Sequence, residues 1–495
     1  MVYANAVISY QSVMKQRCTH AHARLLPPSS FVPRLALRVA ARQSYLLVVY
    51  LLLALLANAQ KQHDSKLTKG FWRTDGYGEL VELDGTALRS YELTSISCIP
   101  AQTRQRDETR SSNSIAVFPS GNSLISIRST DDPNLMYMRW DWAAADIILH
   151  RTGSLPERCK QNPPNTPGEN YAIFWQTFAE QYPFFALRKL DWHAAEQQYR
   201  PRVTPSITSR ELFHIFQQMI EPLNDTHTSL EAPDIKMEFE GSRPDAGHLT
   251  DADWKKAASV IETTYVQDHV RAYCKERIQF GMLRNSIGYL RVTTFYDYAD
   301  GSYADELQCL QRSLDSIFGS AGTLKGLVID VRLNKGGDDP LGIEIASRLT
   351  DKKYLAYAKA ARNSTSLDAP LTFSEKQPVW VVPSARPSFR GKVALLIGPD
   401  TVSAGETFTM ALMEREPHVL RIGLNTQGVF SDVLRRALPN GWYIGLPNEV
   451  YYTQDGKAFD ATGVPPYIHV PFFTPRDLLG SRDAALEEAV RELSN

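Results

Sequence analysis

The sequence has little cysteine and lacks any metal-binding motif. Five of its 495 residues are cysteine, none in a CxxC spacing, and its eleven histidines include no HExxH pattern. We therefore expect no cofactor and no structural or catalytic metal. Bulk basicity is also absent, because the formal net charge is −1, and this argues against a nucleic-acid partner. A composition of 43% hydrophobic and 22% charged residues excludes collagen-like, coiled-coil and disordered chains, and the length predicts two or three domains.

Acidic residues are missing from the first 63 positions, although seven basic residues occur there. Residues 45–57 form an unbroken apolar run of thirteen, which is shorter than the roughly 20 residues that span a bilayer comfortably. Ala57-Asn58-Ala59 then supplies small residues at the positions that a signal peptidase requires. Residues 1–59 are thus predicted to be a signal peptide or, alternatively, an uncleaved N-terminal anchor. Either interpretation places the body outside the cytoplasm, in the periplasm or extracellular space, with membrane contact only through this segment.

Removing residues 1–59 takes away six basic residues and no acidic ones, so the net charge falls from −1 to −7. Four cysteines remain: Cys98, Cys159, Cys274 and Cys309. Four cysteines allow three pairings, and their spacing leaves free thiols and disulfides equally open. No particular oligomeric state is indicated.

The remaining chain divides into four predicted regions by its local patterns. Short β-type runs separated by Gly and Asp turns predict a small antiparallel domain over residues 60–153. Residues 154–286 are expected to be a linker and a helical domain, including a helix over 251–277. Buried strands alternating with helices predict an α/β core over 287–475, and residues 476–495 a C-terminal helix. We read the aromatic-rich stretch 171–185 as core packing.

The α/β core has four predicted strands, at residues 287–292, 324–333, 391–398 and 418–423. Helices are expected between them, which is typical of parallel strands with helices packed on the sheet. In such sheets functional residues gather at the carboxyl ends of the strands. Two of these ends carry candidate residues.

The first strand end carries Gly336 and Gly337, and the second carries Ser403 at the start of a helix. A serine there could act as a nucleophile, with the N–H of Ala404 stabilising the oxyanion. Taken alone, however, Ser403-x-x-Glu406 is more typical of a capping box, and a glycine pair more typical of a turn. His227, in a polar turn after a helix, is the best candidate for a base, although an isolated histidine in a turn usually has no catalytic role.

Together these motifs resemble the S41 serine peptidases, the tail-specific and tricorn-like family. The resemblance covers some 300 residues and includes five segments in family order, namely LNDTHT (223–228), GLVIDVRLNKGG (326–337), KVALLIGPDTVSAGETF (392–408), RIGLNTQGVFSD (421–432) and FDATGVPPYIHV (459–470). It implies a core related to ClpP and crotonase. It also implies an exported serine endopeptidase that acts on peptides or unfolded proteins.

Within this family, one branch uses a lysine base in a loop that here reads Thr426-Gln427-Gly428, so that lysine is absent. The resemblance therefore implies the tricorn-like branch, with His227 as base and Asp460 as the acid that orients it. Family members usually carry Glu at the latter position. The oxyanion hole is expected from Ala404 with Gly336 or Gly337. No PDZ domain is expected.

The alternative is a non-catalytic protein that binds apolar, retinoid-like ligands on the same fold, for which the aromatic stretch 171–185 would be suited. A pure binder has no reason to carry both Ser403 and His227, so the sequence favours the hydrolase.

Overall fold

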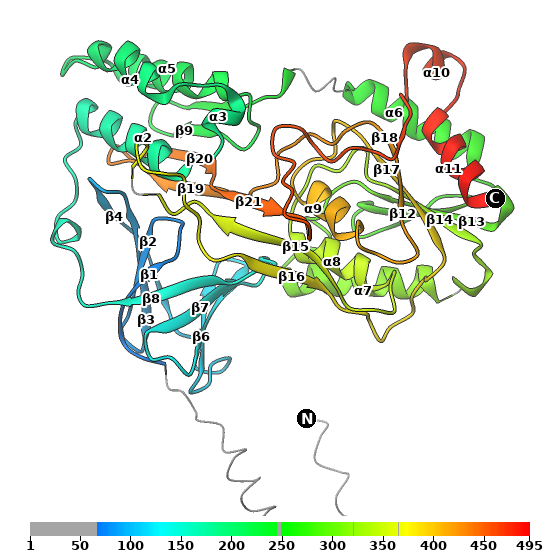
Figure 1. Cartoon of the computed structure of the whole chain (residues 1–495), viewed down its shortest axis with the longest axis horizontal. Helices are drawn as coiled ribbons and strands as arrows, with labels where there is room; N and C mark the ends of the chain where they lie inside the picture. The colour runs from blue at the N-terminus through cyan, green and yellow to red at the C-terminus, as the bar shows by residue number, and fades with distance from the viewer. Residues whose placement is uncertain (1–66, 245–248, 320, 365) are drawn as a thin grey trace, which may run out of the picture. The chain divides into compact units, whose positions relative to one another are not determined.

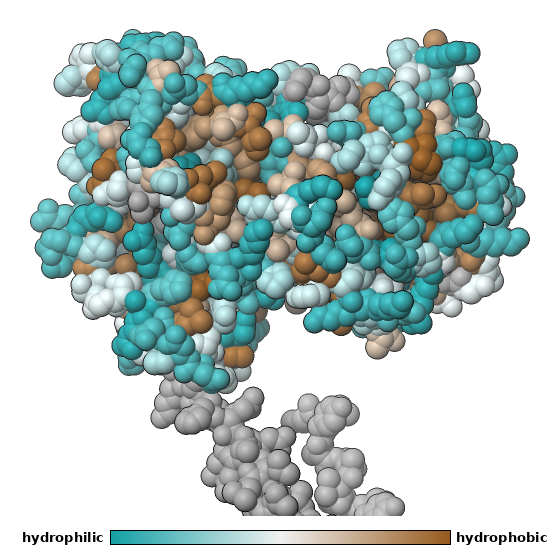
Figure 2. All heavy atoms as spheres, viewed as in Figure 1, coloured by the Kyte–Doolittle hydropathy of each residue, from teal (hydrophilic) through white to brown (hydrophobic). Residues whose placement is uncertain are grey.

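The computed structural model describes residues 67–244, 249–319, 321–364 and 366–495 (Figure 1). The predicted signal peptide or anchor, residues 1–59, lies outside the described residues. Among the helices that are described, none is both long enough and apolar enough to cross a membrane. Figure 2 shows hydrophilic side chains over much of the visible face, with smaller hydrophobic areas between them.

The N-terminal part is an eight-stranded antiparallel sheet, which confirms the predicted antiparallel unit. Its strands are β1 (Gly70–Thr74), β2 (Glu79–Leu83), β3 (Ala87–Leu93), β4 (Cys98–Gln105), β5 (Ile115–Ser120), β6 (Ser123–Ser129), β7 (Leu135–Trp140) and β8 (Ile147–Thr152). They lie in the order β4-β3-β2-β1-β8-β7-β6-β5. A Cys98–Cys159 disulfide links β4 to the short helix η1 (Glu157–Cys159) that follows the sheet, which settles the open question for this pair.

The next region is a helical layer built around aromatic side chains. It contains α2 (Pro167–Gln181), α3 (Phe185–Arg188), α4 (Trp192–Tyr199), η2 (Arg200–Arg202), α5 (Ser209–Ile220) and η3 (Glu221–Leu223). Phe174 of α2 stacks on Phe216 of α5, with ring centroids 4.1 Å apart and planes 1° from parallel. Phe174, Phe178 and Tyr182 are fully buried, which confirms that this stretch packs a core.

Below these helices lies a four-stranded sheet in the order β10-β9-β20-β19. Its strands are β9 (Ser229–Ala232), β10 (Met237–Glu240), β19 (Val433–Ala437) and β20 (Tyr443–Pro447). Segments some 200 residues apart in the chain therefore share one sheet. His227 lies just before β9, and the sheet pairs β9 with β20, which in turn pairs with β19. The sheet therefore brings the turn that carries His227 close to the chain around residue 432.

The α/β core is a seven-stranded sheet in the order β11-β12-β13-β14-β17-β18-β22, and it confirms the predicted fold class. Its strands are β11 (Arg271–Tyr273), β12 (Ile278–Leu283), β13 (Ile287–Val292), β14 (Gly326–Asp330), β17 (Lys392–Ile397), β18 (Leu420–Gly423) and β22 (Ile468–His469). The five strands from β13 to β22 run parallel, whereas β11 and β12 form an antiparallel hairpin.

Helices cover both faces of this sheet, so its central strands are mostly apolar. Leu327 and Ile329 of β14 pack on the face that carries α7 (Tyr303–Phe318), α8 (Asp339–Ser347) and α9 (Ala404–Ala411). Val328 packs on the opposite face against α6 (Asp251–Val260), α10 (Pro475–Leu479) and α11 (Ala484–Ser494). A three-stranded sheet, β16-β15-β21, completes the core with β15 (Tyr354–Ala361), β16 (Gln377–Val381) and β21 (Glu449–Tyr452).

One predicted helix is partly wrong. Residues 251–277 were expected to be helical, but the helix ends with the π-turn η5 (Ile261–Tyr265), and the hairpin of β11 and β12 follows. Cys274, Lys275 and Glu276 have φ values of 49°, 51° and 65°, which a right-handed helix excludes. The hairpin is also tied to α7 by a Cys274–Cys309 disulfide. Pairing with β13 and this crosslink override the local helical pattern.

Candidate active site

Ser403 lies between β17 and α9 in a strained backbone conformation. Its φ is 56° and its ψ is −121°, a region that residues with a side chain rarely adopt and that costs about 1–3 kcal/mol. The Ser403 side chain makes no capping hydrogen bond, so the capping box with Glu406 does not form. Its hydroxyl has no hydrogen-bond partner among the described residues. Strain at this serine leaves the hydroxyl available for chemistry instead of for the helix.

Gly336 and Gly337 follow β14, and Gly336 packs directly beside this serine. A Cβ on Gly336 would lie 2.7 Å from the Cβ of Ser403, and φ values of 81° and 128° at the two positions favour glycine. The Gly336 N–H already donates to Asn334 Oδ1 at 3.0 Å. The N–H groups of Gly337 and Ala404, by contrast, donate to no acceptor in the described part of the chain. Of the two predicted glycines, Gly337 therefore has the unoccupied donor.

His227 lies in the turn between η3 and β9, and the buried carboxyl of Asp225 fixes this turn. The Asp225 carboxylate accepts from the backbone N–H of His227 at 3.1 Å and from the Tyr182 hydroxyl at 3.0 Å, and it lies 3.3 Å from the Arg188 guanidinium. The backbone of Ser431 lies close enough to the imidazole to favour its charged form, and the Nδ1 atom is buried with no hydrogen-bond partner among the described residues. Burial lowers the pKa of His227, and the nearby carboxylates of Asp225 and Asp432 only partly oppose this.

One segment, residues 426–432, contacts both Ser403 and His227. The Ser403 N–H donates to the Val429 carbonyl at 2.9 Å, and two residues further on the Ser431 backbone lies beside the imidazole of His227. Thr226, beside His227, donates its hydroxyl to Gln427 Oε1 at 2.6 Å. The structure thus holds the predicted nucleophile and the predicted base against one short stretch of backbone.

Asp460 also lies against this segment, since the N–H of the next residue, Ala461, donates to the Gly428 carbonyl at 2.8 Å. Both Asp460 carboxyl oxygens are buried without a hydrogen-bond partner. Burial, with smaller contributions from the Glu406 and Asp225 carboxylates, raises the pKa of Asp460 well above its usual range. The described residues show no hydrogen bond or ion pair between Asp460 and His227.

Glu406 has a role that its sequence position does not suggest. It is fully buried, and its carboxylate accepts from Gly428 N and Val429 N at 2.7 Å each and from the Thr426 hydroxyl at 2.5 Å. Burial raises the pKa of Glu406 to about 7. Instead of capping α9, Glu406 braces the segment 426–432 that contacts the serine and the histidine.

Two further groups near the site were not identified from the sequence. Lys359 of β15 is buried, and its Nζ lies 2.7 Å from Asp432 Oδ2 and 2.9 Å from Glu449 Oε1. The only sequence signal for this cluster is one lysine within the otherwise apolar β15 run YLAYAKAA. Burial raises the pKa values of Asp338 and Asp339, just after the glycine pair, to about 7.

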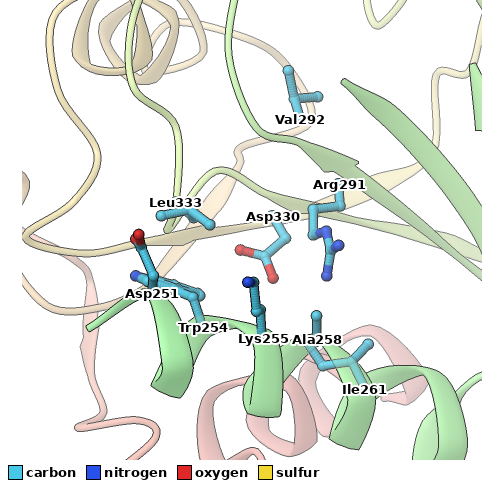
Figure 3. Close-up of a pocket in the computed structure, with 9 residues that line it drawn as sticks. All are labelled: Asp251, Trp254, Lys255, Ala258, Ile261, Arg291, Val292, Asp330 and Leu333. Atoms are coloured by element: carbon cyan, nitrogen blue, oxygen red, sulfur yellow. The ribbon is translucent and has the colours of Figure 1, made fainter. Parts of the chain in front are cut away.

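A separate cavity of about 240 Å³ lies between α6 and the ends of β13 and β14 (Figure 3). Its lining is Asp251, Trp254, Lys255, Ala258, Ile261, Arg291, Val292, Asp330 and Leu333. None of the predicted site residues lines it. Its wall is nevertheless joined to the serine loop, because Trp254 Nε1 donates to Asp400 Oδ2 at 3.1 Å.

Comparison with known proteins identifies two family domains. Residues 286–470 match the model of peptidase family S41, and residues 163–221 match that of the tricorn protease C1 domain. The chloroplastic carboxyl-terminal-processing peptidase 2 of Arabidopsis thaliana is 25% identical over 194 residues, which are 39% of this chain and 33% of that protein. This chain therefore spans about a third of the length of that relative.

Among solved structures, a suspected peptidase from Parabacteroides merdae shares the fold. It is 23% identical, with a TM-score of 0.56, and the match covers 67% of this chain and 98% of the other. The similarity extends well beyond the 194 residues aligned by sequence and includes nearly all of the bacterial protein.

Proposed function

Because this chain belongs to the S41 peptidase family, we propose that it is a serine peptidase that hydrolyses peptide bonds with Ser403, His227 and Asp460. The observation that carries the proposal is the strained Ser403, whose hydroxyl has no partner among the described residues and which packs against Gly336. A helix-capping serine would have neither feature.

In the proposed reaction, the Ser403 hydroxyl attacks the scissile carbonyl and His227 accepts its proton. The oxyanion that forms is stabilised by the N–H groups of Ala404 and Gly337. These two donors are chosen because neither N–H donates to another acceptor among the described residues. His227 then donates the proton to the leaving amine. Water attacks the acyl-enzyme with the same base, and this returns Ser403 to its starting state.

Asp460 is proposed to orient His227 through Nδ1. Three unpaired buried atoms support this role, namely His227 Nδ1 and the two Asp460 carboxyl oxygens. A buried polar atom without a partner costs about 1–3 kcal/mol, so a hydrogen bond between the two side chains during catalysis would remove this cost on both sides. Proton acceptance by His227 would also stabilise the ionised form of Asp460.

The proposed substrate is a peptide or an unfolded protein, and the proposed location is outside the cytoplasm. The leader at residues 1–59 supports export, and so do the two disulfides, because disulfides persist in oxidising compartments. Whether the leader is cleaved or remains as an anchor is a separate question from the reaction.

The test is labelling of the full chain with a fluorophosphonate probe, followed by peptide mapping. Labelling is expected at Ser403 and is expected to be lost in Ser403→Ala. His227→Ala should lower peptide turnover by at least about 10²-fold, and Asp460→Asn by a smaller factor. Absence of both labelling and peptide digestion in the folded protein would reject the peptidase and favour the ligand-binding alternative.

A further inference from the structure

The turn between β1 and β2 of the N-terminal sheet is bound to the peptidase core. Its first residue, Asp75, accepts from Asn363 Nδ2 at 2.6 Å and from the backbone N–H of Glu375 at 3.0 Å. The carbonyl of Tyr77, two residues later, accepts a hydrogen bond from the Arg436 guanidinium. Tyr77 itself has a φ of 61°. These contacts hold the turn in a fixed position against the core.

The side chain of Tyr77 reaches a buried ionic cluster. Its hydroxyl donates to Glu449 Oε1 at 2.6 Å, the same oxygen that lies 2.9 Å from Lys359 Nζ. The exposed fractions of Glu449 and Lys359 are only 1% and 4%. Because one ammonium group faces the carboxylates of both Glu449 and Asp432, the cluster has an excess of negative charge, and a neutral hydroxyl donor stabilises it.

Glu449 in turn holds the backbone beside the catalytic residues. Its second oxygen, Oε2, accepts from the Asp432 N–H at 3.2 Å. Ser431 is fixed in the same place, because its hydroxyl accepts from the N–H groups of Asn448 and Glu449 at 3.0 and 3.1 Å. Ser431 is the residue whose backbone lies beside the His227 ring. A continuous set of contacts therefore runs from Tyr77 to His227.

The cluster also borders a cavity of about 360 Å³ between the N-terminal sheet and the core. Tyr77, Lys359, Asp432 and Glu449 all belong to its lining. If the turn moved away, water would reach the ion pairs, and charge pairs exposed to water attract each other much less strongly. The position of the turn thus affects how firmly the residues before β19 are held.

We propose that Tyr77 is a positioning residue for the active site, through which the N-terminal sheet fixes the residues that contact His227 and Ser403. This inference rests on the proposed peptidase function for its catalytic consequence. It gives the N-terminal unit a direct role in the site, in addition to any contact that it makes with substrate.

The test compares Tyr77→Phe with Tyr91→Phe in the full chain. Each change removes one hydroxyl from the same sheet, but the Tyr91 hydroxyl bonds only Glu82, at 3.4 Å and within that sheet. Tyr77→Phe is expected to lower kcat about tenfold with KM within about twofold of the wild type, since a hydrogen bond to a charged group is lost away from the substrate. Tyr91→Phe should leave both parameters unchanged. Equal kcat values for the two variants would overturn the proposal.

A second measurement does not depend on catalysis. Amide hydrogen exchange should be faster by about tenfold at Ser403 and at residues 429–432 in Tyr77→Phe, and unchanged there in Tyr91→Phe. Equal exchange in the two variants would overturn the positioning role even if the wild type proved not to be a peptidase. Faster exchange in Tyr77→Phe, together with a wild type that no fluorophosphonate labels, would instead reject the proposed function and retain the link from turn to site.

Discussion

At the scale of single residues, the environment of His227 determines how activity should vary with pH. The pKa of His227 lies below its usual value of about 6.5, because burial disfavours the charged ring more than Asp225 and Asp432 favour it. A general base must be neutral, so activity is lost as the pH falls through this lowered pKa. We expect the acid limb of kcat/KM to have its midpoint below pH 6.5, as measured with a peptide substrate over pH 4–8.

Two other buried groups in the site have higher pKa values than His227, so the pH profile distinguishes their titration from that of the histidine. The pKa values of Glu406 and Asp338 are raised to about 7, so a limb near pH 7 would belong to these carboxyls and would contradict His227 as the controlling group. Asp432→Asn provides a directed check. It removes one carboxylate that favours the charged ring, and the midpoint should therefore move to lower pH.

The sequence pointed to the proposed catalytic residues more readily than to those that are proposed to position them. Ser403, His227 and Asp460 each lie in a short motif, and a motif can be recognised from consecutive residues alone. Lys359 and Glu449 do not, because they meet across two strands that are about 90 residues apart. The role of Glu406 was misread for the same reason, since its partners in the segment 426–432 are distant in sequence whereas a capping box is local.

At the scale of elements, the motif Asp-x-Arg after β14 has a structural explanation. Arg332 is fully buried, with Nη2 2.6 Å from Asp330 Oδ2 and 2.8 Å from Asp483 Oδ2. Asp483 is the N-cap of α11, so this one guanidinium joins the central strand to the C-terminal helix. The rings of Phe472 and Phe473 lie 4.9 and 4.6 Å from it.

Arg332→Ala would leave two buried carboxylates without their cationic partner. Loss of one partner from a buried ion pair costs about 3–5 kcal/mol, and the free energy of unfolding should fall by about this amount in urea titrations. Arg482→Ala is the matched control, because Arg482 lies just before the same helix, its ion pair with Glu487 is partly solvent-exposed, and this pair should contribute about 0–1 kcal/mol. A similar small loss for both variants would show that Arg332 does not hold α11.

The strands of the core were predictable because they are buried on both faces and are therefore mostly apolar. The hairpin of β11 and β12 was not, since residues 251–277 are locally polar and helix-like throughout. Its fold depends on pairing with β13 and on the disulfide to α7, and neither is a property of the segment itself. Local pattern therefore predicted the centre of the sheet better than its edge.

At the scale of the whole molecule, the number of free thiols tests both cleavage of the predicted leader and export to an oxidising compartment. Within the described residues all four cysteines are paired, as Cys98–Cys159 and Cys274–Cys309. The fifth, Cys18, belongs to the predicted leader. Each proposed state of the exported protein therefore has its own number of free thiols.

Protein made in a host that exports it, denatured without reductant and titrated for thiols, should contain none if the chain is cut before Gln60. An uncleaved anchor would give one, from Cys18. Reduction of the same samples should raise these numbers to four and five, which controls for incomplete titration. N-terminal sequencing should begin at Gln60 in the first case. Four free thiols before reduction would contradict both disulfides, and with them the argument that the body of this chain matures in an oxidising compartment.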